Sequence, residues 1–279
     1  MSHLDPATDL PGTWERALYV ASDGEVDCTT VTTWIQGPTL FVDLRQSPEL
    51  DRLTGARCLL DLQRDQLLRL CEQSAFAGVT EREGGLCRWR RRLDLHPAAA
   101  LPDEGTLRWE NGALVEEGVH EPYTEYWNLV ERVRATAAAR LRDPQTGAFG
   151  LLVRAGSWFG YARDRSVALS AGPLAEQLHR CRTPLEAARL MDCEVSLGQV
   201  VGGRWRIARS TLPHRVGAML APRLDPDGNR LRVRDTDLYG RQGDRYLDVV
   251  AVEGPRQLLA VTEDVAPSRP AAHRPALSE

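Results

Sequence analysis

The sequence contains no lysine, and all 35 of its basic residues are arginines. This absence excludes enzymes that use a lysine amine: Schiff-base and pyridoxal-phosphate enzymes, P-loop hydrolases, protein kinases and acyl enzymes of the Ser-x-x-Lys type. A high-GC bacterial coding bias is the simplest explanation of so complete a replacement. Arginine also suits fixed, bidentate ion pairs better than lysine does.

Other signatures are missing as well. With a net charge of −4 and a pI of about 5.9, the chain is expected to bind neither nucleic acid nor anionic membranes. No apolar run is long enough to span a bilayer, and residues 1–6 lack the basic and apolar regions of a signal peptide, so a cytoplasmic location is expected. The G-x-G-x-x-G, G-x-S-x-G, H-E-x-x-H and EF-hand patterns are absent, so no cofactor and no metal are expected.

The six cysteines are irregularly spaced and form no C-x-x-C pair. Without an export signal they are expected to be free, buried thiols in a reducing compartment. The pattern His179-x-Cys181 is too slight for a zinc site.

Short runs of strand-forming residues, separated by turn signals, fill both halves of the chain. The clearest hairpin signal is Asn111-Gly112, which lies between two alternating runs. Helices are expected near 59–71, 173–181 and 184–191. The segment 124–141 is ambiguous: residues 124–127 indicate a strand, whereas 133–141, with their alanine run, could form a helix.

These patterns predict a mainly β protein with two tandem antiparallel lipocalin- or calycin-like barrels, each with one or two short helices. A chain of 279 residues is long enough for two domains. The expected domains are an N-terminal barrel over 12–141 and a C-terminal barrel over 142–264. Residues 1–11 and 265–279 are polar or proline-rich and are expected to be disordered.

An internal repeat supports the two-barrel interpretation. A shift of 118 positions aligns Phe41 with Phe159 and Arg45 with Arg163. This pattern indicates duplication of one domain rather than a solenoid, which needs a shorter period and at least three copies. A Gly-x-Trp sequence at Gly12, typical of the first lipocalin strand, opens the first expected strand.

Several blocks of the first half, taken in order, resemble one family. The blocks are Thr39–Arg45, Phe76–Gly78, Trp89–Arg91 with Asp94, Pro102–Gly105, Asn111–Gly118 and Tyr123–Trp127. They are similar to the fungal two-domain calycin-like family known as interactors of the yeast casein kinase 1, of which this chain would be a bacterial relative. The resemblance covers residues 12–128. It implies two lipocalin-like barrels packed together and supplies no established catalytic residues.

The expected strand over 39–45 carries the candidate site. Its period of two places Phe41, Asp43 and Arg45 on one face and apolar residues on the other. If the first face lines the barrel, the acid and the guanidinium form a buried pair able to hold a ligand oxyanion. If that face meets solvent, they form an ordinary surface ion pair of little energetic value.

Aromatic residues are the candidate walls of a ligand pocket. The candidate ligand-binding residues are Trp34, Phe41, Asp43, Arg45, Trp89, Tyr126 and Trp127. Of the neighbours Tyr126 and Trp127, one must point into the barrel and the other away from it. Arg88, Arg90 and Arg92 fit either an exposed basic stripe or a patch for an anion or an acidic partner.

Three residues are candidates for acid–base catalysis: Asp43, His96 and His120. His120 follows Glu116 and Glu117, and a histidine beside carboxylates serves as a general base with a raised pKa. Loop histidines without such a role are commoner.

The function expected from the sequence is therefore binding of a small, partly apolar molecule. The alternative is a cofactor-free barrel enzyme, such as an isomerase, cyclase or dehydratase, that uses a carboxylate–histidine pair. A third hypothesis is a protein-interaction scaffold, and a protein partner is compatible with all three.

Overall fold

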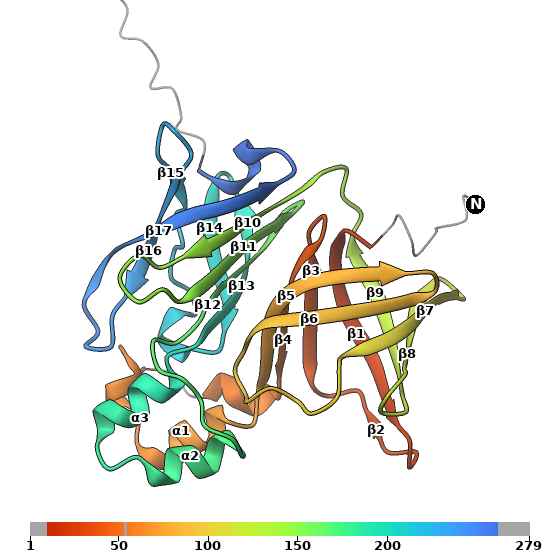
Figure 1. The fold of residues 1–279 in the computed structure, drawn as a ribbon, viewed down its shortest axis with the longest axis horizontal. Helices are drawn as coiled ribbons and strands as arrows, with labels where there is room; N and C mark the ends of the chain where they lie inside the picture. Colours follow the sequence, from red (N-terminus) through yellow and green to blue (C-terminus); the bar gives the residue numbers. More distant parts are fainter. Residues whose placement is uncertain (1–9, 53–54, 262–279) are drawn as a thin grey trace, which may run out of the picture.

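The computed structural model describes residues 10–52 and 55–261, and its framework is β-sheet (Figure 1). The strands of the first half are β1 Gly12–Ala21, β2 Val26–Asp27, β3 Val31–Gln36, β4 Leu40–Gln46, β5 Ser74–Glu83, β6 Leu86–Asp94, β7 Glu104–Glu110, β8 Ala113–Gly118 and β9 Tyr123–Glu131. They form an antiparallel sheet in the order β2-β1-β3-β4-β5-β6-β7-β8-β9, and β1 also pairs with β9. That pairing closes β1 and β3–β9 into an eight-stranded barrel, an architecture that fits a calycin-like fold.

The second half forms a sheet of its own that stays open on one side. Its strands are β10 Thr136–Arg142, β11 Phe149–Ala155, β12 Trp158–Arg163, β13 Glu194–Val201, β14 Arg204–Ser210, β15 Arg223–Leu224, β16 Arg230–Thr236 and β17 Gln242–Glu253. Their order is β14-β13-β12-β11-β10-β17-β16-β15. The segment 217–220 crosses from β14 toward β16: Leu220 N donates to Trp205 O at 2.9 Å, and Arg234 N donates to Leu220 O at 2.8 Å. The predicted fold class is confirmed, with one closed barrel and one half-barrel.

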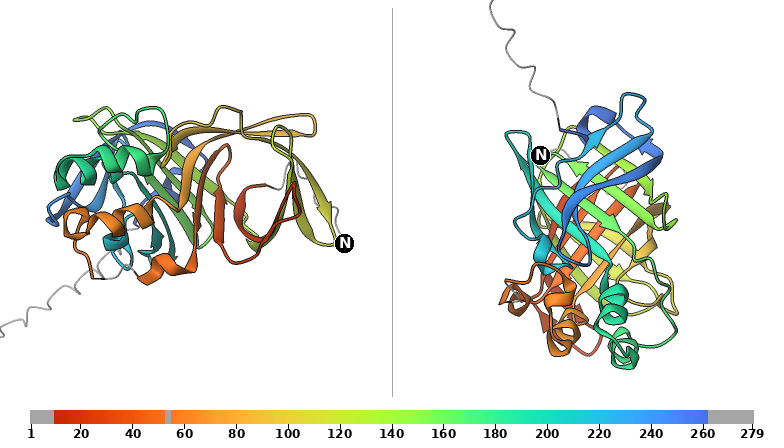
Figure 2. Two further views of the ribbon diagram at one scale, coloured as in Figure 1. Left: turned by 90° about the horizontal axis from the view of Figure 1, so that it is seen from below. Right: turned by 90° about the vertical axis from the view of Figure 1, so that its left-hand side faces the viewer.

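Three short helices lie together at one end of the molecule (Figures 1 and 2). They are α1 Arg64–Leu70, α2 Leu174–Arg180 and α3 Pro184–Met191, and 3₁₀ turns lie at Pro48–Arg52, Leu59–Asp61, Pro213–Arg215 and Arg256–Leu259. A capping box starts α3, because Thr183 Oγ1 accepts a hydrogen bond from Glu186 N at 3.1 Å. The helices predicted at 173–181 and 184–191 are confirmed, and the one at 59–71 divides into a 3₁₀ turn and α1. No helix in the described part of the chain is long and apolar enough to cross a membrane.

The two faces of β4 separate two hydrophobic cores. Leu40, Val42 and Leu44 pack in a layer shared with α1 and with β11, β12 and β13 of the second half. Phe41 points the opposite way, into the barrel, with the tryptophans of β1, β3, β6 and β9. The halves approach so closely that a Cβ added to Gly160 would lie 2.8 Å from the Val42 Cβ. The two sheets are therefore joined by a continuous apolar core.

With the two-residue strands β2 and β15 left aside, each half has three strands, a helical segment and further strands, five (β5–β9) in the first half and four (β13, β14, β16 and β17) in the second. In each half the first and last strands pair, β1 with β9 and β10 with β17. The pairing of β5 with β6 shifts register at Gly78, and that of β13 with β14 shifts at Gly198. At both glycines an added Cβ would collide with a carbonyl oxygen of the next strand. This common plan agrees with the repeat in the sequence.

The boundary between the halves differs from the expected one. Residues 136–142 form β10, which pairs with β11 and β17, so the helix considered for 133–141 is wrong. The chain passes from the first sheet to the second between Glu131 and Thr136, whereas the sequence prediction places this strand in the N-terminal unit. Pairing with distant strands, which the sequence does not show, decides which sheet a strand joins.

Two smaller expectations also need correction. Leu10 is buried and its carbonyl accepts a hydrogen bond from Trp14 Nε1 at 2.8 Å, so the ordered core begins inside the segment 1–11. The rest of the expected disordered ends, 1–9 and 265–279, lies outside the described residues. All six cysteines are free, as expected, but Cys28 is exposed and Cys181 is half-buried.

Candidate functional site

A chain of ion pairs crosses one end of the barrel. Arg45 Nε donates to Asp43 Oδ1 at 2.9 Å, and Arg45 Nη1 donates to Glu125 Oε1 at 2.9 Å. Arg16 Nη1 donates to the same Glu125 oxygen at 2.7 Å, and its Nη2 donates to Asp27 Oδ2 at 2.7 Å. These five residues are called the Arg45 network below.

Barrel closure assembles the Arg45 network. The face of β4 that carries Asp43 and Arg45 points into the barrel, since Asp43 is buried and Phe41 beside it joins the inner core. Arg16 and Glu125 are 109 residues apart in the chain and meet because β1 pairs with β9. Strands β1 and β4 end where β9 begins, so the network lies at one mouth of the barrel.

A buried carboxyl on β8 lies next to the network. Glu116 accepts hydrogen bonds from Tyr123 Oη at 2.6 Å and from Trp127 Nε1 at 3.2 Å. Burial, together with the negative charge of Glu125, raises the pKa of the Glu116 carboxyl well above its usual value. Burial raises the pKa of Asp43 as well, although the guanidinium of Arg45 opposes this shift.

The interior of the barrel below this mouth is filled by indole rings. The ring centroids of Trp34 lie 6.0 Å from Trp14, 5.8 Å from Trp89 and 5.6 Å from Trp127. Trp34 Nε1 also donates to Gln36 Oε1 at 3.1 Å. Trp34, Phe41 and Trp127, predicted as walls of a ligand pocket, thus pack in the barrel core.

A large groove covers the mouth of the barrel. It has a volume of about 1330 Å³ and is lined by Arg45, Trp89 and Glu125 from the barrel interior and by Tyr19 and Tyr123 at the rim. The other wall comes from the segment 97–104 after β6 and from residues 164–171 of the second half. We call this space the mouth groove.

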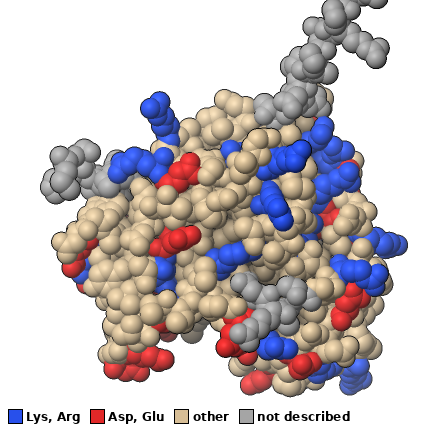
Figure 3. Space-filling view, turned by 180° about the vertical axis from the view of Figure 1, so that it is seen from behind, with Lys and Arg blue, Asp and Glu red and all other residues tan. Residues whose placement is uncertain are grey.

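Charges of both signs line the mouth groove in equal number. Its arginines are Arg45, Arg88, Arg90, Arg91, Arg92 and Arg165. Its acids are Asp94, Asp103, Glu104, Glu121, Glu125 and Asp164. The rear face of the molecule also carries side chains of both signs (Figure 3).

The predicted basic stripe on β6 is largely paired with acids. Arg88 binds Glu104, and Arg90 Nε lies 2.5 Å from Glu81 Oε2. Arg92, the third residue of the predicted stripe, is exposed and has no acid partner in the described part of the chain. Arg91, which was not part of the predicted stripe, binds Asp94 at 2.9 Å and Asp103 at 2.7 Å. Two of the three stripe arginines are thus paired with acids, which lowers the excess positive charge that an anion patch needs.

The remaining predicted residues lie apart from Asp43. Tyr126 is half-buried on the outer face of β9, and its neighbour Trp127 is the one that points inward. His96 Nε2 donates to the carbonyl oxygen of Gln73 at 2.7 Å. His120 Nε2 binds Glu104 Oε2 at 2.9 Å. Both histidines line the mouth groove, and neither is hydrogen-bonded to Asp43 in the described structure.

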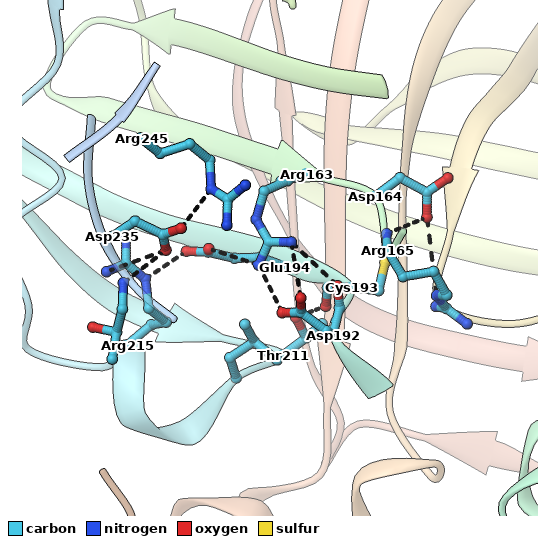
Figure 4. Close-up of polar contacts among 12 residues, drawn as sticks. Arg163, Asp164, Arg165, Asp192, Cys193, Glu194, Thr211, Arg215, Asp235 and Arg245 are labelled. Carbon is cyan, nitrogen blue, oxygen red and sulfur yellow. Dashed lines mark hydrogen bonds and ion pairs between the residues drawn. The ribbon is translucent and has the colours of Figure 1, made fainter. Parts of the chain in front are cut away.

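The second half contains a buried polar cluster at the corresponding place (Figure 4). Arg163 Nη2 donates to Asp192 Oδ1 at 2.8 Å, and Arg215 Nε donates to Glu194 Oε1 at 2.8 Å. Arg245 Nε binds Asp235 Oδ2 at 2.5 Å. Arg163, Glu194 and Arg215 are almost fully buried, so this cluster, called the Arg163 cluster, lies in the interior of the second half.

No role was predicted for Arg16, Tyr123 or Glu125, and Glu116 was considered only as a carboxylate beside His120, which binds Glu104 instead. Period-two alternation was the available signal, because Glu116 and Glu125 share the inward faces of β8 and β9 with Leu114 and Trp127. An acid at an inward strand position has to be paired, and that indicates a site. In the described part of the chain no group of three or more His, Cys, Asp or Glu residues is arranged to hold a metal ion.

Comparison with known proteins adds little to this picture. No protein-family model matches the chain, and no curated protein matches it. Among solved structures, the crystal structure of an uncharacterized protein from Saccharomyces cerevisiae, YLR301w, is similar, with a TM-score of 0.49 and 12% sequence identity. The similarity covers 88% of this chain and 99% of the yeast chain. Function has to be inferred from the geometry of this chain.

Proposed function

We propose that this protein binds a small, partly apolar molecule in the mouth groove. The observation that carries the proposal is the position of Arg45. Its side chain is 24% exposed to the groove, while its partners Asp43 and Glu125 are 4% and 1% exposed. A guanidinium held rigidly by buried acids at the floor of a large concave space is typical of a binding site.

The surroundings suit a ligand with an apolar body. Segments 97–101 and 167–171, which consist mostly of alanine, leucine, valine and proline, line the groove. Trp89 offers an aromatic surface at the floor. Because the barrel below is filled by tryptophans, the ligand lies at the mouth of the barrel rather than inside it.

Native mass spectrometry of the freshly purified protein tests the proposal, followed by thermal-shift screening of a metabolite library. Ala100 is exposed on the groove wall, so Ala100→Trp should block the groove without touching the core. Ala113→Trp, at the distant β7–β8 hairpin, is the matched control. We expect a bound mass or a thermal shift that Ala100→Trp abolishes and Ala113→Trp keeps. No ligand by either method, or a shift insensitive to Ala100→Trp, would contradict the proposal.

A cofactor-free enzyme is the second candidate, and the Glu116–Tyr123 contact favours it. The carboxyl of Glu116, whose pKa burial raises, accepts a hydrogen bond from Tyr123, which lines the groove, and this contact gives a route for a proton between core and ligand. NMR of a bound ligand incubated with the protein tests this. Conversion of the ligand to a product, at a rate that Tyr123→Phe lowers, would support an enzyme. A ligand that stays unchanged would contradict the enzyme and support binding without catalysis.

We also propose that the chain is a relative of the two-domain calycin-like family and that its halves, divided between Glu131 and Thr136, arose by duplication. Support comes from the sequence blocks, from the barrel architecture and from the common order of elements. The equivalent strand positions of Arg45 and Arg163 also support the duplication.

A further inference from the structure

The two halves of the chain carry opposite net charges. Residues 1–131 contain 12 arginines and 23 acids, whereas residues 132–261 contain 21 arginines and 13 acids. The net charge of −4 therefore combines an acidic first half with a basic second half. Such an asymmetry between halves indicates that the basic half meets a negatively charged partner.

Arginines lie side by side on the outer face of the second sheet, over β10, β16 and β17. Ala139, Leu231 and Leu247, one from each strand, point into the second core, so the residues that alternate with them point outward. The right-hand view of Figure 2 looks onto β16 and β17 (blue). We call this surface the Tyr246 face, and its outward residues are Arg140, Arg142, Arg230, Arg232, Arg234, Asp244, Tyr246, Asp248 and Val250.

The acids of the Tyr246 face are too few to neutralise its arginines. Asp244 lies 3.1 Å from Arg232 and 3.2 Å from Arg234, so one carboxylate serves two guanidinium groups. Asp248 lies 3.5 Å from Arg230. All three of these arginines stay partly exposed, and each keeps N–H groups that can donate to a further anion.

The two arginines of β10 add positive charge that no acid balances. Arg140 and Arg142 are exposed and form no ion pair in the part of the chain that the structure describes. The nearest acid at this end of β17, Glu253, is engaged by the first half, because Thr39 N donates to it at 2.9 Å. The Tyr246 face therefore has an excess of guanidinium groups, which bind phosphate well.

An exposed aromatic ring lies among these charges. Tyr246 is 51% exposed and lies directly opposite Arg232 in the pairing of β16 with β17. An aromatic ring on a sheet surface is a platform on which unpaired bases stack, and arginines around it bind the phosphates. An acidic protein would use the arginines but has no need of the ring.

A hollow beside Tyr246 has room for one nucleobase. Its volume is about 330 Å³, and Tyr246, Pro144, Gln145 and Gln242 are among the residues that line it. The amide groups of the two glutamines offer donors and acceptors to the edge of a base. Every acid that lines the hollow is ion-paired with an arginine of the second half: Asp143, Asp235, Asp237 and Asp244. The hollow thus suits an uncharged base rather than a phosphate.

We propose that the Tyr246 face binds single-stranded nucleic acid. The arginines bind the phosphates, and one base stacks on Tyr246 and enters the hollow. Bases of a duplex are paired and stacked with one another, so they do not reach it. The proposal goes beyond the proposed function, because it concerns a different surface. It also departs from the expectation that the chain binds no nucleic acid, which rested on the net charge of the whole chain.

Fluorescence anisotropy of the full chain with a labelled single strand of about 12 nucleotides tests the proposal. The comparison probes are an abasic strand of the same length, a duplex of the same sequence and poly-glutamate of the same charge. We expect the single strand to bind at least about tenfold more tightly than the abasic strand or poly-glutamate, and more tightly than the duplex, because only it offers free bases. Its affinity should fall as salt is added.

Variants of exposed residues locate the contacts. Tyr246→Ala should weaken binding of the single strand about tenfold and leave the abasic strand unaffected, because the stacking of a base is lost. Tyr239→Ala, 59% exposed and outside the hollow, is the matched control. Arg230→Gln should weaken binding of every probe and lower the slope of log affinity against log salt by about 0.7. Arg108→Gln, on β7 of the first half, should change neither. Near-ultraviolet circular dichroism checks that each variant is folded.

Several results would overturn the proposal. An abasic strand or poly-glutamate that binds as tightly as the single strand would indicate an acidic protein as the partner of this face. Tighter binding of the duplex, or no binding of the single strand at low salt, would also refute it. So would an equal loss of affinity in Tyr239→Ala and Tyr246→Ala. None of these results bears on the mouth groove, which the metabolite screen tests separately.

Discussion

Arg163 in β12 lies at the position that Arg45 occupies in β4: each is the last inward-facing residue of its strand, and each binds acids of its own half. The two differ in their surroundings. The Arg45 side chain is 24% exposed at the mouth groove, whereas Arg163 is 4% exposed inside the Arg163 cluster. An arginine at the same strand position thus borders the mouth groove in the first half and is buried in the interior of the second half.

This difference predicts unequal effects on stability. Arg163→Met leaves Asp192 without its partner and leaves the buried Glu194 with Arg215 alone. We expect the free energy of unfolding to fall by about 3–5 kcal/mol, the usual cost of breaking a buried ion pair from one side. Arg45→Met is the matched comparison. It removes the guanidinium from the buried Asp43 while Glu125 keeps Arg16, and it should cost less than Arg163→Met because the Arg45 side chain is 24% exposed and water reaches its site. Urea denaturation measures both, and an equal or smaller loss for Arg163→Met would refute the distinction.

Local signals in the sequence were sufficient for much of the fold. Asn111 and Gly112 both adopt positive φ, at 50° and 88°, which is the hairpin turn that the Asn-Gly pair predicts. Strand β5 was not predicted from the sequence, because its small residues and Gly78 give no clear alternation of apolar and polar residues. The alanines of β10 left that segment ambiguous, since alanine favours helices and only pairing with β11 and β17 fixes it as a strand.

For a similar reason, only part of the candidate site could be predicted from the sequence. Period two placed Asp43 and Arg45 on one face, and the structure brings that face inside the barrel. The contact between Arg16 and Glu125 depends on barrel closure across 109 residues, and no local pattern reports it. Arg165 belongs to the second half and lines the groove because the two sheets pack together. A single sequence does not show this packing either.

The raised pKa of Glu116 predicts a pH dependence of stability. In the unfolded chain this carboxyl ionises near 4.5, whereas burial keeps it protonated to higher pH in the fold. Above that value the folded state therefore holds one proton more than the unfolded state, and stability falls as the pH rises toward the folded pKa. Glu116→Gln mimics the protonated acid and removes this loss. Its stability relative to the wild type should rise with pH, by at most about 1.4 kcal/mol per pH unit.

Urea denaturation over a pH series measures this difference. Glu117→Gln, on the exposed face of the same strand, is the control and should change stability little at any pH. Parallel pH profiles for Glu116→Gln and the wild type would show that Glu116 ionises normally in the fold.

Thiol labelling should distinguish the cysteines by burial. Cys28 is exposed, whereas burial raises the pKa of Cys71 and of Cys193 to about 11. Because the thiolate is the reactive form, a disulfide reagent at mildly alkaline pH should modify Cys28 first and spare the other two. Mass spectrometry of partly labelled protein identifies the site, and Cys28→Ser should remove the fast phase. Rapid labelling of Cys193 in the folded protein would contradict its burial.

The glycines at the two bulges should be the least replaceable residues of their strands. A Cβ at Gly78 would collide with the carbonyl oxygen of Arg90, and one at Gly198 with that of Arg206, so neither neighbour can move without breaking strand pairing. We expect Gly78→Ala and Gly198→Ala each to lower the free energy of unfolding by about 1–3 kcal/mol or more. Gly243→Ala in β17 is the matched control, because nothing lies within 4 Å of its added Cβ. Thermal and urea unfolding measure the stability of the three variants. If all three were as stable as the wild type, the close approach at Gly78 and Gly198 would be disproved.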